Sequence, residues 1–351
     1  MEPPEATKFS RRALLGAGAG AGLVVGGGLV VRNQLRHPHR DKSSRPDGRY
    51  RRLVLACPHP AHDPVLMVAQ RQGVFARYNL DITVQGGLAS GQQALDRLHP
   101  GGADAVVAPA LSWLPRLLAG LDARLVGGLQ SGSARLLVDR KSPIKRIEDL
   151  HRKAIGIADT PADGYPGADR LFFSIMMRRK GMDPNRDVSW LQIAPDQFST
   201  ALASRQVQAV VGHDPVIWQL REALHLSELA SSMTGSYGTR VSRVLGLRGD
   251  ILRSDPAAAV TLVLAFQEAA ISVARHLDAA ASVLADELPD MDQASIESML
   301  RAEGHAVHPD GPELREQIAQ YIDELKLIGL VADELDSAAT AKRFCANIIH
   351  H

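Results

Sequence analysis

The chain is poor in cysteine and in aromatic residues, and neither sign of charge is in clear excess. Its 351 residues include two cysteines, Cys57 and Cys345, so it has no paired-cysteine spacing typical of a zinc site or redox motif. Aromatic residues make up 4%, which argues against a stacking platform for single-stranded nucleic acid. The formal net charge of +1 argues against any nucleic-acid partner. We expect both cysteines to be buried free thiols, with a disulfide as the alternative in an oxidising compartment.

The first segment predicts export from the cytoplasm. Ser10, Arg11 and Arg12 precede an uncharged run, rich in Gly, Ala and Val, that extends to Val31. Paired arginines before a weakly hydrophobic, glycine-rich core resemble a twin-arginine export signal. An uncleaved membrane anchor is the alternative, because residues 13–31 are about long enough to span a bilayer. We therefore assign residues 1–31 to a signal or anchor, and the polar, basic residues 32–50 to a linker.

A strand, a loop with two histidines and a helix open the folded part of the chain. Residues 53–56 are an apolar run typical of a buried parallel strand, and prolines at positions 58 and 60 end it. Asp63 before Pro64 has the arrangement of a helix N-cap followed by a first-turn proline. In open α/β sheets, ligands bind where strands end near helix N-termini. This loop is therefore the first candidate for a binding site.

The alternation of strands and helices then occurs twice, which indicates two lobes built on largely parallel sheets. In the first set, we predict strands at residues 80–84, 103–107, 124–127 and 134–138, and helices at residues 92–98 and 111–118. The second set begins with a capped helix at residues 142–150 and continues with strands at residues 153–157, 188–193 and 208–211 and helices at residues 168–179 and 197–203. A strand at residues 241–247 returns to the first lobe, and an outer helical shell follows at residues 257–276, 292–302 and 313–327. These predictions assign residues 51–138 and 245–351 to lobe 1 and residues 139–244 to lobe 2.

Four segments, in order, resemble one family of solute receptors. They are Ala69-Gln-Arg-Gln-Gly-Val-Phe75 with Asn79-Leu-Asp-Ile82, Ser90-Gly-Gln-Gln-Ala-Leu95 with Ala103-Asp-Ala-Val106, Ser142-Pro-Ile-Lys-Arg-Ile-Glu-Asp-Leu150 with Ala154-Ile-Gly-Ile157, and Ala201-Leu-Ala-Ser-Arg-Gln-Val-Gln-Ala209 up to Asp214-Pro215. They are similar to segments of the substrate-binding proteins of nitrate, sulfonate, taurine and bicarbonate ABC importers, a family that also includes thiamine-pyrimidine binders. The sequence departs from the family pattern at scaffold positions such as His151, Arg152 and Arg205.

The resemblance implies an α/β, two-lobed, periplasmic-binding-protein-like (type II) fold with parallel-rich mixed sheets and a helical C-terminal shell. It also implies a periplasmic receptor, expected to be a monomer, that delivers a small polar solute such as an oxyanion or sulfonate to the membrane subunits of an ABC importer. Ligand is expected to close the lobes about a hinge near residues 138–141 and 241–246. We expect no cofactor, no resident metal and no enzymatic activity.

The predicted ligand contacts lie on loops at strand ends and at helix N-termini, where the two lobes would face each other. They are His59, His62, Asp63, Ala110, Ser112, Ser131, Thr160, Asp163, Tyr165, His213, Asp214 and Tyr237. Asp63 and Ser112 fit helix caps equally well, and His213 with Asp214 fits a structural pair. The aspartates would repel an anion unless the histidines, Arg135 or Arg240 offset them.

Several alternatives follow from the same residues. A pyrimidine or amine-bearing solute would suit the aspartates better than an anion does. His59, His62 and Asp63, facing His213 and Asp214, have the ligand types of a metal receptor. The anchor reading of residues 13–31 would suit a membrane-tethered sensory receptor. The fungal thiamine-pyrimidine synthases share the fold but carry a cysteine-rich motif that this chain lacks, which argues against an enzyme.

Overall fold

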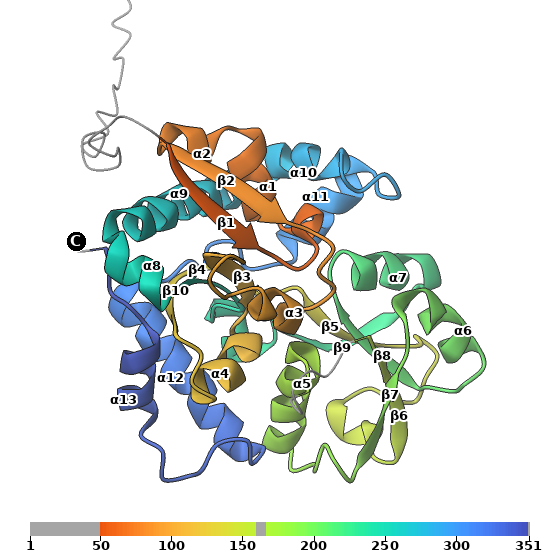
Figure 1. Ribbon diagram of the computed structural model, residues 1–351. Coiled ribbons are helices and arrows are strands. Elements are labelled where there is room, and N and C mark those ends of the chain that lie inside the picture. Colours follow the sequence, from red (N-terminus) through yellow and green to blue (C-terminus); the bar gives the residue numbers. More distant parts are fainter. Residues whose placement is uncertain (1–49, 159–165, 350–351) are drawn as a thin grey trace, which may run out of the picture. The chain divides into compact units, whose positions relative to one another are not determined.

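The computed structural model describes residues 50–158 and 166–349, which contain two five-stranded sheets (Figure 1). The predicted signal or anchor, residues 1–31, lies outside the described residues. The strand order is β2-β1-β3-β10-β4 in the first sheet and β7-β6-β8-β5-β9 in the second. The strands are β1 (Arg51–Ala56), β2 (Leu80–Gln85), β3 (Ala105–Pro109), β4 (Ala123–Gln130), β5 (Ala134–Val138), β6 (Lys153–Ile157), β7 (Val188–Gln192), β8 (Ala209–His213), β9 (Ser227–Ser231) and β10 (Arg243–Arg248).

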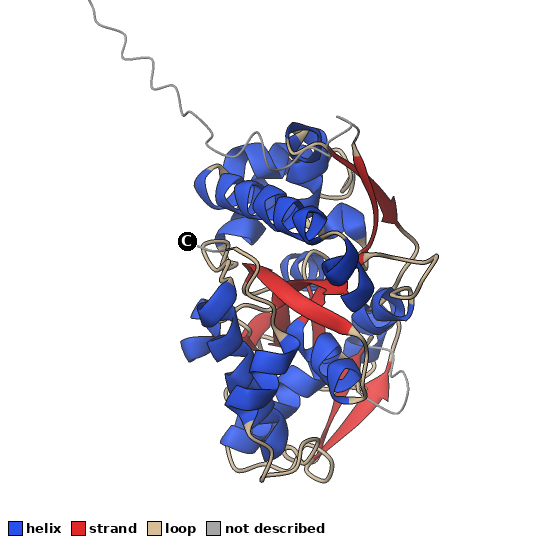
Figure 2. Ribbon diagram, turned by 60° about the vertical axis from the view of Figure 1, so that its left-hand side comes forward, coloured by secondary structure: helices blue, strands red, loops and turns tan. Residues whose placement is uncertain are grey.

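Helices pack on both sides of the strands (Figure 2). They are α1 (Pro64–Arg71), α2 (Val74–Arg77), α3 (Gly91–Asp96), α4 (Ala110–Leu118), α5 (Ala168–Arg179), α6 (Phe198–Ala203), α7 (Val216–Leu224), α8 (Gly249–Ser254), α9 (Pro256–Arg275), α10 (Leu277–Ala285), α11 (Gln293–Arg301), α12 (Gly311–Leu327) and α13 (Ser337–Phe344). The first lobe is the first sheet with the helices packed on it, and the second lobe is the second sheet with its helices.

The first sheet confirms the predicted strand that opens the fold and the mixed character of the sheet. β1 pairs in parallel with β2 and β3, while β10 runs antiparallel between β3 and β4. Asp63 caps α1, because its Oδ1 accepts a hydrogen bond from the Leu66 N–H at 2.9 Å. The loop between β1 and α1 is therefore held at the carboxyl end of a buried strand, as the sequence predicts.

The second sheet contains β5, which the predicted lobe boundary after residue 138 assigns to the first lobe. β5 runs antiparallel to β8 and to β9 in the second sheet, whereas we predicted it in the first lobe. The chain therefore crosses between the sheets at residues 131–133, immediately after β4, and returns at residues 232–242. Strands that follow each other in the sequence are often neighbours in one sheet, and the prediction assumed this for β4 and β5.

The apolar core holds α4 closely against β10. Trp113 of α4 is fully buried, and its indole N–H donates to the Val244 carbonyl of β10 at 3.2 Å. A Cβ on Gly246 would lie 2.5 Å from the Trp113 ring, so the glycine allows α4 to approach β10 this closely.

On the other face, α1, α9, α10 and α11 share an apolar cluster with β1, which confirms part of the predicted helical shell. α9 is long and apolar enough to span a membrane by length and composition, but 56% of its most apolar window is buried.

The predicted helix over residues 142–150 is wrong. Only residues 147–150 form a short 3₁₀ turn, and the preceding residues form a loop. The Asp149 carboxylate accepts hydrogen bonds from the backbone N–H groups of Lys145 and Arg146 at 2.9 and 3.2 Å. These side-chain bonds offer the backbone an alternative to helical bonding, as aspartate commonly does.

Candidate functional site

A cavity of about 310 Å³ lies between the edges of the two sheets, and both lobes line it. The first lobe contributes the loop after β1 and the first residues of α3 and α4. The second lobe contributes the end of β8 and the first residues of α5 and α7. The N-terminus of a helix carries a partial positive charge and N–H groups without intrahelical partners. The cavity is therefore bordered, from both lobes, by the helix ends that favour anionic groups.

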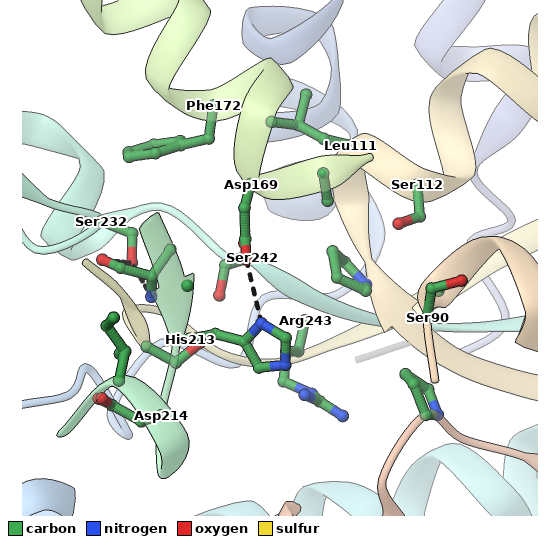
Figure 3. Close-up of a pocket in the computed structure, with 18 of the residues that line it drawn as sticks. Ser90, Leu111, Ser112, Asp169, Phe172, His213, Asp214, Ser232, Ser242 and Arg243 are labelled. Carbon is green, nitrogen blue, oxygen red and sulfur yellow. Dashed lines mark hydrogen bonds and ion pairs between the residues drawn. The ribbon is translucent and has the colours of Figure 1, made fainter. Parts of the chain in front are cut away.

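Much of the cavity wall is apolar. Leu111 of α4 and Phe172 of α5 lie on one side of the space shown in Figure 3. Phe198, Ile217, Pro58 and Pro195 also line it. Small-molecule sites typically combine such apolar walls with a few polar groups that fix orientation. The arrangement suits a solute with both an apolar body and a polar end.

Three histidines from the two lobes meet at the cavity. The His59 and His62 rings stack with their centroids 5.3 Å apart, and the His213 ring of the second lobe lies 6.4 Å from that of His59. Burial, together with the neighbouring His213, lowers the pKa of His59. Burial, together with the neighbouring His59, lowers the pKa of His62 to about 4. These lowered pKa values favour the uncharged form of both side chains at neutral pH, in which they offer directional hydrogen bonds rather than positive charge.

The orientation of two of these rings is set by protein partners. His213 Nδ1 lies 3.0 Å from Asp169 Oδ2, and a dashed line marks this pair in Figure 3. His59 Nε2 lies 3.2 Å from the Ala89 carbonyl oxygen. Because a carbonyl only accepts, we assign the proton of neutral His59 to Nε2. Asp169 and His213 come from different elements of the second lobe, so their pairing positions the first turn of α5 against β8.

Asp63 lies behind the cavity wall and is neutralised there. Its Oδ2 lies 2.8 Å from an amino group of Arg243, and its side chain is 1% exposed. The same guanidinium contacts the sulfur of Cys57 at 3.5 Å. Burial and the Asp63 carboxylate raise the pKa of Cys57 to about 12, so this cysteine is a thiol and a poor nucleophile. Arg243, which lines the cavity, was not among the predicted site residues.

Asp214 lines the cavity and is also paired. Arg135 Nε donates to its carboxylate at 3.0 Å and Arg135 Nη2 donates at 2.7 Å. Arg135 also binds Glu228 at 2.6 Å and lies over the Trp218 ring. The repulsion that Asp63 and Asp214 would exert on an anion is thus offset by Arg243 and Arg135, of which the sequence analysis anticipated only the second.

The structure brings half of the predicted contacts together at the cavity. His59, His62, Ala110, Ser112, His213 and Asp214 line it. Asp63, Ser131 and Tyr237 are buried and do not line it. Ser131 Oγ donates to the Gly238 carbonyl at 3.1 Å, and the Tyr237 hydroxyl donates to Glu324 at 3.0 Å, so both support the crossing between the lobes. Thr160, Asp163 and Tyr165 lie outside the described residues.

Further polar groups line the cavity that were not among the predicted contacts. They are Ser90, Ser133, Ser232, Ser242 and Arg243, together with Arg240, which the sequence analysis named only as a charge that would offset the aspartates. Ser242 and Arg243 precede or begin β10, and Ser133 precedes β5. Both strands are antiparallel to their neighbours, so their amino ends reach the cavity. The rule that ligands bind at the carboxyl ends of strands applies to parallel strands, so it does not select these residues.

Ser112 brings a buried hydroxyl, without a protein partner in the described part of the chain, to the cavity. Its side chain is buried in the first turn of α4, and its hydroxyl has no hydrogen-bond partner among the described residues. A Cβ on Gly91 would lie 2.4 Å from this hydroxyl, which shows how closely α3 and α4 approach here. A ligand acceptor at this point would satisfy the buried donor.

The histidines are not arranged as a metal centre. In the part of the chain that the structure describes, no group of three or more His, Cys, Asp or Glu side chains is placed to hold a metal ion. This geometry gives no support to the metal-receptor alternative.

The chain matches one protein-family model and resembles several solved structures. Residues 57–286 match the model of the NMT1-like family. The alkanesulfonate-binding protein SsuA of Xanthomonas axonopodis pv. citri, bound to MOPS, superposes with a TM-score of 0.67 at 18% identity over 83% of this chain and 98% of that chain. The periplasmic aliphatic sulphonate binding protein SsuA of Escherichia coli gives 0.66 at 17% identity over 84% and 92%. The periplasmic nitrate-binding protein NrtA of Synechocystis PCC 6803 gives 0.65 at 15% identity over 85% and 86%. No curated protein matches the chain.

These three structures are binding proteins and share the predicted periplasmic-binding-protein fold. Each is less than a fifth identical to this chain, so the likeness establishes the fold and leaves the solute open.

Proposed function

This chain belongs to the NMT1-like family, and from that premise we propose that it is the extracytoplasmic solute receptor of an ABC importer, binding a small organic oxyanion such as a sulfonate. The similar sulfonate- and nitrate-binding structures support this class of protein. The observation that carries the proposal is the cavity between the lobes, bordered by the N-termini of α4 from one lobe and of α5 and α7 from the other. A solute held there contacts both lobes at once, as a receptor that closes on its ligand requires.

The paired charges at the cavity are compatible with a negative charge on the solute. Asp63 and Asp214 are each paired with a buried arginine, so neither presents an unbalanced carboxylate to the cavity. The helix N-termini then supply the attraction, and Ser112 supplies a donor. The apolar wall of Leu111, Phe172 and Phe198 supports an organic body, which an inorganic ion such as nitrate would lack.

We propose His59, His62, Ala110, Ser112, His213 and Asp214 as ligand contacts, with Arg243 added from the structure. The hinge is proposed at residues 131–133 and 232–242, where the chain passes between the sheets. The partners proposed are the membrane subunits of the importer, with the receptor acting as a monomer.

A thermal-shift panel tests this function. We expect hexanesulfonate and benzenesulfonate to stabilise the purified protein, by about 2.7 kcal/mol at one hundred times the dissociation constant. Nitrate, cytosine, ethanolamine and zinc serve as the competing ligand classes. The buffers must contain no sulfonate, since MOPS itself occupies one of the similar structures. Solution scattering should show a smaller radius of gyration with the best ligand. Stabilisation by the amine or the pyrimidine alone would reject an anionic solute.

For localisation, we propose export to the periplasm by the twin-arginine route, with residues 1–31 either cleaved or retained as an anchor in the inner membrane. Ser10, Arg11 and Arg12 before the glycine-rich run motivate this proposal. Replacing Arg11 and Arg12 together with lysine should leave the protein in the cytoplasm, as judged by cell fractionation. Unchanged export of the double variant would contradict the proposed route.

A further inference from the structure

Arg240 brings a buried guanidinium group to the cavity. The residue is 7% exposed, lines the cavity, and lies in the segment that carries the chain back from the second sheet to the first. Its backbone N–H donates to the Tyr237 carbonyl at 3.0 Å, at the end of a 3₁₀ turn over Gly235–Thr239. The turn therefore fixes the point from which this side chain extends.

Aromatic rings hold the guanidinium group in place. It lies over the rings of Tyr237 and Tyr321, with its central carbon 5.0 Å from each centroid. Phe172 meets Tyr237 edge to face, with the centroids 4.9 Å apart. Phe172, from α5 of the second lobe, and Tyr321, from α12, also line the cavity. Stacking on a ring attracts a cation without using its N–H groups, so the donors of Arg240 are positioned and not consumed.

The ion pairs of this arginine leave a positive charge in excess. Glu324 Oε1 lies 2.8 Å from Nη1 of Arg240 and 2.6 Å from Nη2 of Arg179. Burial and the Glu324 carboxylate raise the pKa of the Tyr237 hydroxyl, which therefore stays neutral and adds no charge. Two guanidinium groups thus share one carboxylate. The Arg179 side chain is 47% exposed and solvated, whereas that of Arg240 is 8% exposed.

The hydrogen bonds of Arg240 are incomplete as well. Within the described ranges, neither its Nε nor its Nη1 has a hydrogen-bond partner, because the Glu324 oxygen lies close to Nη1 but outside hydrogen-bonding geometry. A buried cationic donor without a partner is costly. An anion in the cavity would supply both the missing acceptor and the missing charge.

The other arginine of the cavity wall is better balanced. Arg243 has a buried carboxylate of its own, Asp63, at 2.8 Å. Its guanidinium group also contacts the Cys57 sulfur. Because its charge is already compensated inside the protein, an anion gains less there than at Arg240.

We propose that Arg240 binds the acidic group of the solute and is the residue that distinguishes an anion from a neutral solute of the same shape. This rests on the proposed function, because it names the charge-reading contact of that same cavity. The role differs from that of Ser112, whose hydroxyl can donate to a neutral acceptor as well as to a charged one. The apolar carbon next to the acidic group lies against Phe172 and Tyr321.

The experiment compares an anion with its uncharged analogue. Benzenesulfonate and benzenesulfonamide have nearly the same shape, and at pH 7.5 the first is an anion and the second is neutral. Calorimetry in Tris buffer gives the two dissociation constants, and their ratio is the charge preference of the cavity. We expect the parent to prefer the anion by about tenfold to 100-fold, the range of a charge-assisted hydrogen bond. In Arg240→Met the preference should fall below about threefold, since only the anion loses its partner.

Arg179→Met is the matched control. Arg179 also pairs with Glu324 and lies over the Tyr237 ring at 5.7 Å, but it does not line the cavity. Each variant leaves Glu324 with one arginine, so both should fold, and circular dichroism checks this. Arg179→Met should keep the charge preference of the parent. Arg240→Gln, which is also uncharged, should lose the preference in the same way and replaces Arg240→Met if that variant does not fold.

The outcomes separate this inference from the receptor function. If Arg240→Met keeps the preference of the parent, or loses affinity for both ligands equally, Arg240 is a structural residue and the inference fails, while the receptor function stands. If the parent binds neither compound, benzoate and benzamide replace them. A parent that prefers the anion in neither pair rejects the anion site at Arg240, and the thermal-shift panel decides separately whether another class of solute binds.

Discussion

Replacing Arg243 with methionine is expected to lower the free energy of unfolding by about 3 to 5 kcal/mol. Methionine keeps much of the aliphatic volume but leaves the Asp63 carboxylate without its cation. That carboxylate is 1% exposed and 2.8 Å from the guanidinium in the native protein. Water cannot replace the lost partner, so the charge must be buried unpaired or neutralised by a proton. Urea denaturation at pH 7.5 measures the loss.

Two further variants separate this effect from general damage. In the double variant Asp63→Asn with Arg243→Met, the asparagine still caps α1 and no charge is buried, so most of the stability should return. Arg51→Met is the matched single control, because its partner Asp255 also caps a helix, α9, but is 32% exposed. It should cost about 1 kcal/mol or less. A loss in Arg243→Met no larger than that in Arg51→Met would show that Asp63 is not dependent on its buried partner.

The parts of the fold that the sequence predicts well are those decided by local physics. The apolar run of β1, the prolines that end it and the cap at Asp63 all act within a few residues of one another. The predicted helix over residues 142–150 is wrong even though its cause is also local. The hydrogen bonds of the Asp149 side chain compete with helical bonding, but they leave no signature in the spacing of apolar residues. Pairing of β5 with β8 joins distant segments, and apolar pattern alone does not select between the two sheets.

The candidate site divides along the same line. His59, His62 and Ser112 follow parallel strands, where the general rule for α/β sheets places ligands, and they line the cavity. Arg243 lies at the amino end of an antiparallel strand, so that rule passes over it. Its pairing with Asp63 changes the electrostatic conclusion: the carboxylate that seemed to disfavour an anion is neutralised by a residue far away in the sequence. Only the three-dimensional arrangement supplies that cancellation.

Replacing Ser112 with alanine is expected to weaken sulfonate binding by about tenfold to 100-fold while leaving the fold intact. The Ser112 hydroxyl is buried, has no partner among the described residues and lies in the first turn of α4. In the free protein, an unpaired buried hydroxyl costs about 1 to 3 kcal/mol, so its removal should be neutral or slightly stabilising. In the complex, a hydrogen bond to an anionic acceptor contributes about 1.5 to 3 kcal/mol, which the alanine variant loses.

Ser242→Ala is the matched control for Ser112→Ala, because Ser242 also lines the cavity but its hydroxyl is satisfied by the protein. That hydroxyl lies 3.3 Å from the carbonyl oxygens of both Gln130 and Gly132. Its removal should lower the stability by about 1 kcal/mol and change the affinity little. A loss of affinity in Ser112→Ala and a loss of stability in Ser242→Ala would separate a ligand contact from a scaffold residue. If Ser112→Ala binds hexanesulfonate as tightly as the parent, the start of α4 contributes through its backbone alone, and Ser112 is no part of the recognition.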